Sequence, residues 1–128
     1  MYEILVCEYS KKHYIKPFKK KYKTWNSTFS TIENMLSHVD MFLLSSKIEK
    51  IHICDTWYIA KCEFKIVWTN QSAKWSWNRI IIFVDEENWK VQILLLYAKT
   101  DVWGHNETNW WEKEIKNNYK EIYDLFWY

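Results

Sequence analysis

The 128-residue sequence contains only one glycine, one proline and one arginine, which are Gly104, Pro17 and Arg79. At the usual frequency of about 7%, a chain of this length holds roughly nine glycines. No glycine-rich phosphate loop of the GxxxxGK[ST] or GxGxxG type is present, which argues against a nucleotide-binding domain. With 48% hydrophobic and 27% charged residues, the chain has the composition of one globular domain, covering residues 1–128.

Long apolar runs and paired cysteines are also missing. The longest apolar runs, 80–84 and 91–97, have the length of strands, far short of the ~20 residues that cross a bilayer. The first four residues carry no basic region, so we expect no signal peptide and no membrane association. The three cysteines form no CxxC pair, which favours a reduced, cytoplasmic protein.

Tryptophan is as abundant as glycine is rare, with ten copies. In Asn88-Trp89 it stands where the Asn-Gly hairpin signal has glycine. We hypothesise that UGA codons were translated as tryptophan in a gene whose host reads them as glycine, as some bacterial lineages do. The alternative is a genuine aromatic surface on which bases stack. Six tryptophans occupy positions typical of turns: Trp25, Trp57, Trp75, Trp77, Trp89 and Trp103.

The order of patterns along the chain predicts an α+β fold. Helical spacing follows a first strand, with Pro17 indicating either a kink or a later start of the helix. The later β-branched and aromatic segments predict strands, of which the almost wholly apolar 91–97 is typical of a central strand. We expect a helical layer on a twisted, mostly antiparallel sheet. The expected strands are 2–9, 48–53, 58–67, 79–84 and 91–97, and the expected helices are 10–22, 28–42 and 106–126, the last capped by Asn106 or Thr108.

Positive charge is concentrated near the N-terminus. Seven lysines and no acid lie between Lys11 and Lys23, although the net charge of the chain is only +2. Such a segment either binds phosphates or is simply the solvated face of a helix. His52, Cys54 and Cys62 alternate on strands, but they lack metal-ligand spacing and we interpret them as core residues.

Three segments taken in order resemble the RelE/HigB-like toxins of type II toxin–antitoxin systems, once glycine is allowed at the turn tryptophans. These segments are Ala60–Lys65 (AKCEFK), Lys74–Arg79 (KWSWNR) and Ile93–Lys99 (ILLLYAK). The basic segment FKKKYKT at Phe18–Thr24 is also typical of the family.

The resemblance implies a RelE-like domain: an N-terminal strand and helical hairpin on a mostly antiparallel sheet, followed by a C-terminal helix. It also implies an mRNA endoribonuclease, acting on the ribosome or on free mRNA, which inhibits translation and is held inactive by a cognate antitoxin. No metal and no other cofactor would be needed. The alternative is a non-catalytic protein with the same fold that binds an antitoxin-like partner or RNA.

Metal-free RNA cleavage requires a base for the 2′-hydroxyl, positive charge at the phosphorane, and an acid for the 5′-oxygen. Arg79 is the first candidate for the phosphate, because a guanidinium binds it in a bidentate manner and the family has arginine there. The other candidate catalytic residues are Lys61, Lys74, Tyr97 and Lys99.

Further residues are expected to bind RNA or to transfer protons. Glu63 stands where the family has an arginine; it either weakens the site or serves as a base. His105, after Gly104, is a possible acid or base. The expected RNA-binding residues are Lys65, Ser76, Lys16, Lys19, Lys20 and Lys23.

Overall fold

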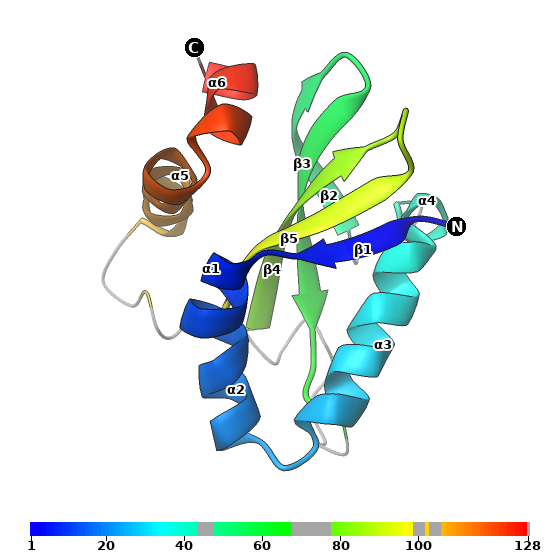
Figure 1. Cartoon of the computed structure of the whole chain (residues 1–128), viewed down its shortest axis with the longest axis vertical. Coiled ribbons are helices and arrows are strands. Elements are labelled where there is room, and N and C mark those ends of the chain that lie inside the picture. The colour runs from blue at the N-terminus through cyan, green and yellow to red at the C-terminus, as the bar shows by residue number, and fades with distance from the viewer. Residues whose placement is uncertain (44–47, 68–77, 99–101, 103–105, 128) are drawn as a thin grey trace.

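The computed structural model describes residues 1–43, 48–67, 78–98, 102 and 106–127. A five-stranded sheet lies at the centre of the molecule, with helices on both faces (Figure 1). The elements in chain order are β1 (Glu3–Val6), α1 (Glu8–Ser10), the π-helical turn η1 (Lys11–Ile15), α2 (Lys16–Lys21), α3 (Trp25–Ser37), α4 (Val39–Phe42), β2 (Ile48–Cys54), β3 (Trp57–Phe64), β4 (Asn78–Asp85), β5 (Lys90–Ala98), α5 (Glu107–Asn118) and α6 (Lys120–Trp127).

The strand order in the sheet is β1-β5-β4-β3-β2. Strands β2 to β5 form an antiparallel meander, and β1 joins the edge of β5 in parallel, with Glu3 opposite Lys90. The predicted α+β fold with a mostly antiparallel sheet is therefore confirmed. Strand β5 lies inside the sheet and is buried over nearly its whole length, as its continuous apolar pattern predicted.

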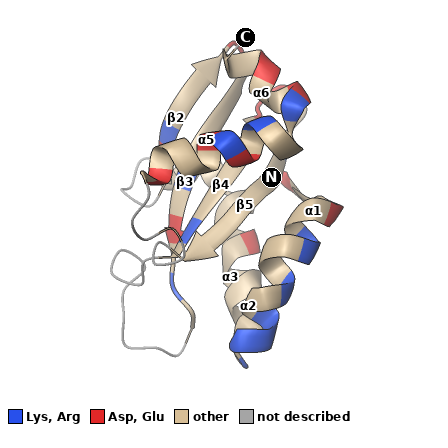
Figure 2. Ribbon diagram, turned by 90° about the vertical axis from the view of Figure 1, so that its left-hand side faces the viewer, with Lys and Arg blue, Asp and Glu red and all other residues tan. Residues whose placement is uncertain are grey.

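Each face of the sheet has its own hydrophobic core. One core joins alternate residues of β3 to α2 and α3, with Ile32 and Leu36 of α3 essentially inaccessible to solvent. The other joins the opposite face to α5, through Trp111 and Ile115. Figure 2 shows α5 crossing this second face, with α3 behind the sheet. The strand alternation thus decides which helix covers each side chain.

The helices differ in detail from the predicted ranges. The first prediction covered residues 10–22 as one helix, whereas the structure has a π-helical turn just before Pro17. Proline cannot donate a backbone hydrogen bond, which explains this wider turn. The last helix divides at Tyr119, whose backbone is not helical (φ −138°, ψ 53°) and which is buried in the second core. Asn106 caps α5 as predicted, accepting a hydrogen bond from the Asn109 amide at 3.1 Å. In the part of the chain that the structure describes, no helix is long and apolar enough to cross a membrane.

The turn tryptophans fall into different environments. Trp89, in the β4–β5 hairpin, has a φ of 55°, in the left-handed region that glycine favours. Asn88 does not share this conformation, so the predicted type I′ turn with two positive φ values is not formed. Trp25 is wrongly predicted as a turn residue, because it begins α3 and is buried against Phe18 and Phe29. Trp57 begins β3 rather than lying in a turn. Trp75, Trp77 and Trp103 lie outside the described residues.

The positive φ at Trp89 predicts an unusual order of stability among its variants. Trp89→Gly and Trp89→Ala both remove the ring contact with Tyr2, so the pair isolates the backbone preference. We expect the glycine variant to be more stable than the alanine variant by about 1 kcal/mol, because only glycine adopts a left-handed φ without strain. At Trp57, inside a strand, the order reverses, with alanine more stable by about 0.5–1 kcal/mol. Urea unfolding of the four variants measures both differences. Equal stability of the Trp89 pair contradicts the prediction.

Candidate functional site

Three neighbouring strands place Glu63, Arg79 and Tyr97 side by side. Arg79 on β4 lies directly opposite Glu63 on β3 and directly opposite Tyr97 on β5. Residues that face each other across a sheet project from the same side. Tyr97 belongs to the second core, so this row lies on the face that α5 covers. The structure therefore brings together three of the residues that the sequence singled out.

Arg79 is a nearly buried cation, with 7% of its surface exposed. Its Nη2 atom lies 3.7 Å from Oε1 of Glu63, and its Nη1 atom donates a hydrogen bond to the Asn78 carbonyl at 3.0 Å. A charge this buried requires a counter-charge, and the half-buried Glu63 supplies it. The position predicted to carry a base or a weakening substitution is therefore the ion-pair partner of the arginine.

Tyr97 is bound by the first turn of α5. Its hydroxyl donates a short hydrogen bond of 2.6 Å to Oε2 of Glu107, and its ring packs edge-on against Trp110, 4.8 Å between centroids. Burial raises the pKa of Tyr97 well above its ordinary value, Glu107 raises it further, and the positive charge of Arg79 opposes the shift. The hydroxyl thus stays protonated and donates its hydrogen bond to the Glu107 carboxylate.

Sequence reasoning missed Glu107, although it touches a predicted site residue. Its place as the first residue of α5, directly after the cap Asn106, is visible in the sequence. The sequence does not reveal that α5 docks onto the sheet, and this docking is what brings Glu107 to Tyr97. A carboxylate in the first helical turn is ordinarily explained by the helix dipole.

The remaining predicted site residues are distributed more widely. Lys61 is half-buried on the same strand and face as Glu63, two residues before it. Lys65 follows the end of β3 and is exposed, so the structure does not continue the predicted strand that gave it the same face as Lys61. The predictions for Lys74, Ser76, Lys99 and His105 fall outside the described residues.

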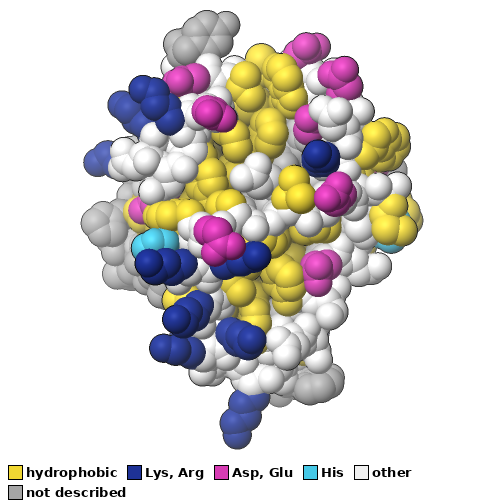
Figure 3. Space-filling view, in the orientation of Figure 1, with side chains coloured by type: hydrophobic (Ala, Val, Ile, Leu, Met, Phe, Trp, Pro, Cys, Tyr) yellow, Lys and Arg dark blue, Asp and Glu magenta, His cyan; other side chains and the backbone are white. Residues whose placement is uncertain are grey.

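The lysines near the N-terminus form a separate exposed surface. Lys16, Lys19 and Lys20 lie on α2, and Lys23 follows it. Helix α2 packs Phe18 into the first core, the one on the other side of the sheet from the Arg79 row. Figure 3 shows the positive side chains gathered at the lower left, over α2. The structure therefore does not join these lysines to the Arg79 row.

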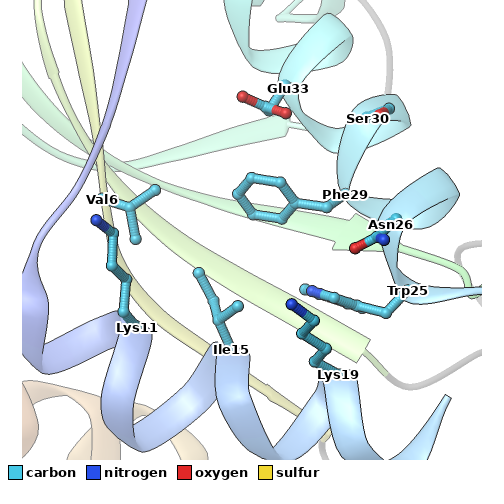
Figure 4. A pocket seen from close by; sticks show the side chains of 9 residues that line it. All are labelled: Val6, Lys11, Ile15, Lys19, Trp25, Asn26, Phe29, Ser30 and Glu33. Carbon is cyan, nitrogen blue, oxygen red and sulfur yellow. The ribbon is translucent and has the colours of Figure 1, made fainter.

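A cleft of about 460 Å³ opens beside these lysines, between the α1–α2 arm and α3. Figure 4 shows Lys11 and Lys19 on one side, with Glu33 and other polar groups of α3 opposite. The cleft is lined mainly by apolar groups, from Val6, Ile15, Trp25 and Phe29, with Asn26 and Ser30 completing its wall. This cleft can hold an apolar side chain whose neighbours carry negative charge.

His52 packs on Trp127, with 4.5 Å between the ring centroids, and lies 4.0 Å from Glu112. Cys62 is fully buried, which raises the pKa of its thiol well above the ordinary value. Within the described ranges, no three His, Cys, Asp or Glu side chains are grouped as metal ligands would be. The interpretation as a core residue is confirmed for Cys62, whereas His52 and Cys54 are only partly buried.

The sheet order, the N-terminal helical arm and the C-terminal helices define a RelE-like fold. A solved structure with this fold is a chain in the crystal structure of the archaeal RelE–RelB complex from Pyrococcus horikoshii OT3. The two chains superpose with a TM-score of 0.55 at 12% sequence identity, over 77% of this chain and 94% of the other. No family model and no curated protein matches the sequence. The likeness establishes the fold, and the roles of individual residues stay predictions.

Proposed function

We propose that this protein is the toxin of a type II toxin–antitoxin module, a cytoplasmic mRNA endoribonuclease that needs no metal and inhibits translation. The observation that carries the proposal is Arg79, the only arginine of the chain, held between Glu63 and Tyr97 on a RelE-like sheet. The resemblance of segments 60–65, 74–79 and 93–99 to RelE/HigB-like toxins supports it independently of the fold.

In the proposed reaction, the 2′-oxygen of the RNA attacks the adjacent phosphorus and the bond to the 5′-oxygen breaks. The products are a 2′,3′-cyclic phosphate and a 5′-hydroxyl. Arg79 stabilises the negative charge that develops on the phosphorane. Glu63 or a lysine such as Lys61 takes the proton of the 2′-hydroxyl, and a second group protonates the leaving oxygen. Tyr97 is a candidate for that acid, because its hydroxyl is protonated at neutral pH and it lies directly opposite Arg79.

One observation favours the non-catalytic alternative. Arg79 and Tyr97 each interact with a carboxylate of the chain itself, so neither is free for a phosphate as the structure stands. A RelE-like protein whose arginine serves only as an ion-pair partner would bind an antitoxin-like protein or RNA without cleaving it.

An RNA cleavage assay distinguishes the endoribonuclease from the non-catalytic binding protein. The purified protein is incubated with single-stranded RNA and with mRNA on translating ribosomes, in buffer containing a chelator. We expect cleavage in at least one arm, with 2′,3′-cyclic phosphate ends, and no cleavage at a 2′-deoxy position. The chain is tested both as written and with glycine at Trp75, Trp77, Trp89 and Trp103, since tryptophan at a positive φ, as at Trp89, costs stability. Absence of cleavage in every arm rejects the enzyme and leaves the binding protein.

The cleft between α2 and α3 supports the antitoxin part of the proposal. Its lining is mostly apolar, and Lys11 and Lys19 stand at its rim. These properties suit an amphipathic protein segment that inserts aliphatic side chains and places acidic residues against the lysines. A single RNA strand suits the cleft less well, because Trp25 is buried and offers no face for stacking.

Reversing the charge of the rim is expected to weaken the antitoxin complex. The double variant Lys11→Glu/Lys19→Glu should reduce co-purification with the cognate antitoxin at least tenfold. The matched control is Lys12→Glu/Lys20→Glu, which changes the net charge equally on the same arm but lies outside the cleft lining. Equal weakening by both pairs would mean that only overall charge matters.

A further inference from the structure

Carboxylates of the chain itself bind both Arg79 and Tyr97 of the candidate site. Glu63 pairs with the Arg79 guanidinium, and Glu107 accepts a hydrogen bond from the Tyr97 hydroxyl. Arg79 and Tyr97 are 7% and 3% exposed. A phosphate group of RNA carries the same charge as these carboxylates and prefers the same donors. The structure therefore shows the site in a state in which internal anions take the place of a substrate.

The two carboxylates are held in different ways. Glu63 lies on β3, in register with Arg79, so its backbone stays opposite the arginine as long as the sheet is intact. Glu107 lies in the first turn of α5, next to the end of the helix, where backbone hydrogen bonds are fewest. The Glu107 contact can therefore open through movement of a helix end, with no change in the sheet.

Further along α5 the helix is anchored firmly. Glu114, seven residues after Glu107, accepts hydrogen bonds from the hydroxyls of Tyr9 and Tyr14 at 3.0 and 3.2 Å. Beyond it, the Tyr119 hydroxyl donates to the Leu94 carbonyl at 2.7 Å, inside the second core. The C-terminal part of α5 is thus fixed to the body of the protein, and its first turn can lift from Tyr97 with the rest of the helix in place.

We propose that the first turn of α5 is a gate over the Arg79–Tyr97 site, closed by the Glu107–Tyr97 hydrogen bond and opened by competition from a phosphate group. The gate rests on the proposed function, because it assigns the same site a closed state. Glu107 in this role is a regulatory residue: it repels an incoming phosphate and withholds the Tyr97 proton from it. Trp110, packed on the Tyr97 ring, moves with the same turn.

The test measures phosphate binding by a variant that lacks the negative charge of Glu107. Glu107→Gln keeps the size of the side chain but replaces a charge-assisted hydrogen bond by a weaker neutral one. The probes are inorganic phosphate and a 2′-O-methyl RNA oligonucleotide, which cannot be cleaved. We expect both to bind about five- to tenfold more tightly to Glu107→Gln than to the wild type, and the gain to disappear when Arg79→Ala is added.

The matched control is Glu114→Gln, which removes the same charge from the same helix and also weakens bonds to tyrosine hydroxyls. It should leave phosphate affinity within twofold of the wild type. An equal gain in Glu114→Gln, or no gain in Glu107→Gln, overturns the gate. A second measurement avoids dependence on the variants: phosphate should accelerate amide hydrogen exchange in the first turn of α5 of the wild type, but not around Ile115. Unchanged exchange in that turn with phosphate bound also overturns the gate.

These outcomes distinguish the gate from the nuclease. A gain in phosphate affinity without RNA cleavage by any variant keeps the gate and rejects the endoribonuclease. Cleavage by the wild type without any gain in Glu107→Gln keeps the endoribonuclease and rejects the gate.

Discussion

Arg79→Ala is expected to lower kcat/KM for RNA cleavage by at least 100-fold. Loss of one preorganised donor to a developing oxyanion typically costs a factor of about 10² to 10³. Arg79 is moreover the only residue of the chain with a guanidinium. Arg79→Lys should recover only part of the loss, because an ammonium group keeps the charge but not the bidentate geometry. Single-turnover cleavage of a defined RNA measures both variants.

Two controls make this result specific. Lys90→Ala removes a positive charge from the exposed end of β5 and should leave the rate within twofold. Arg79→Ala also leaves the half-buried Glu63 without its ion-pair partner, and this loss by itself destabilises the protein. The double variant Arg79→Ala/Glu63→Gln relieves that cost and should regain stability without regaining activity. Cleavage at more than one-third of the wild-type rate in a folded Arg79→Ala protein would remove Arg79 from the mechanism.

Ile115→Ala is expected to lower the free energy of unfolding by about 2–5 kcal/mol. Ile115 on α5 is fully buried in the second core, and truncation of such a side chain leaves a cavity that the surroundings fill only in part. Small domains are stable by about 5–15 kcal/mol, so this single change removes a large share of the stability. Urea unfolding followed by tryptophan fluorescence and by circular dichroism gives the difference.

The neighbouring exposed residue is the control for this prediction. Lys116→Ala changes the same helix without touching the core and should stay within about 0.5 kcal/mol of the wild type. If Ile115→Ala stays as close to the wild type as the control does, α5 contributes little to global stability. The two faces of the sheet would then fold as separate units.

The fold was predictable because its strands carry strong local signals. β-branched and aromatic residues predicted β4 and β5 to within a residue, since burial on both faces leaves no room for polar alternation. The division of the last helix at Tyr119 was not predictable. It depends on a hydroxyl that bonds to Ser10 and to the Leu94 carbonyl, and these partners are far away in the sequence.

The candidate site was predictable in part for the same reason. The family resemblance selected Glu63, Arg79 and Tyr97, and the observed strand register places them in one row. The pairing of Glu63 with Arg79 and the contact of Glu107 with Tyr97 were not foreseen, because they arise from the packing of elements. Glycine-like backbone was correctly expected at Trp89, where a hairpin requires it. It was wrongly expected at Trp25, where the polar neighbours conceal the start of a helix.

The parallel pairing of β1 with β5 determines when the protein can fold during its own synthesis. Glu3 is among the first residues made, and its partner Lys90 is translated 87 positions later. At about 5–20 residues per second, β1 waits roughly 4–17 s for its neighbour. Tyr97 and the helix that covers it are translated later still. A nascent chain therefore lacks the assembled Arg79 row, and the helix that covers it, until most of the chain has been translated.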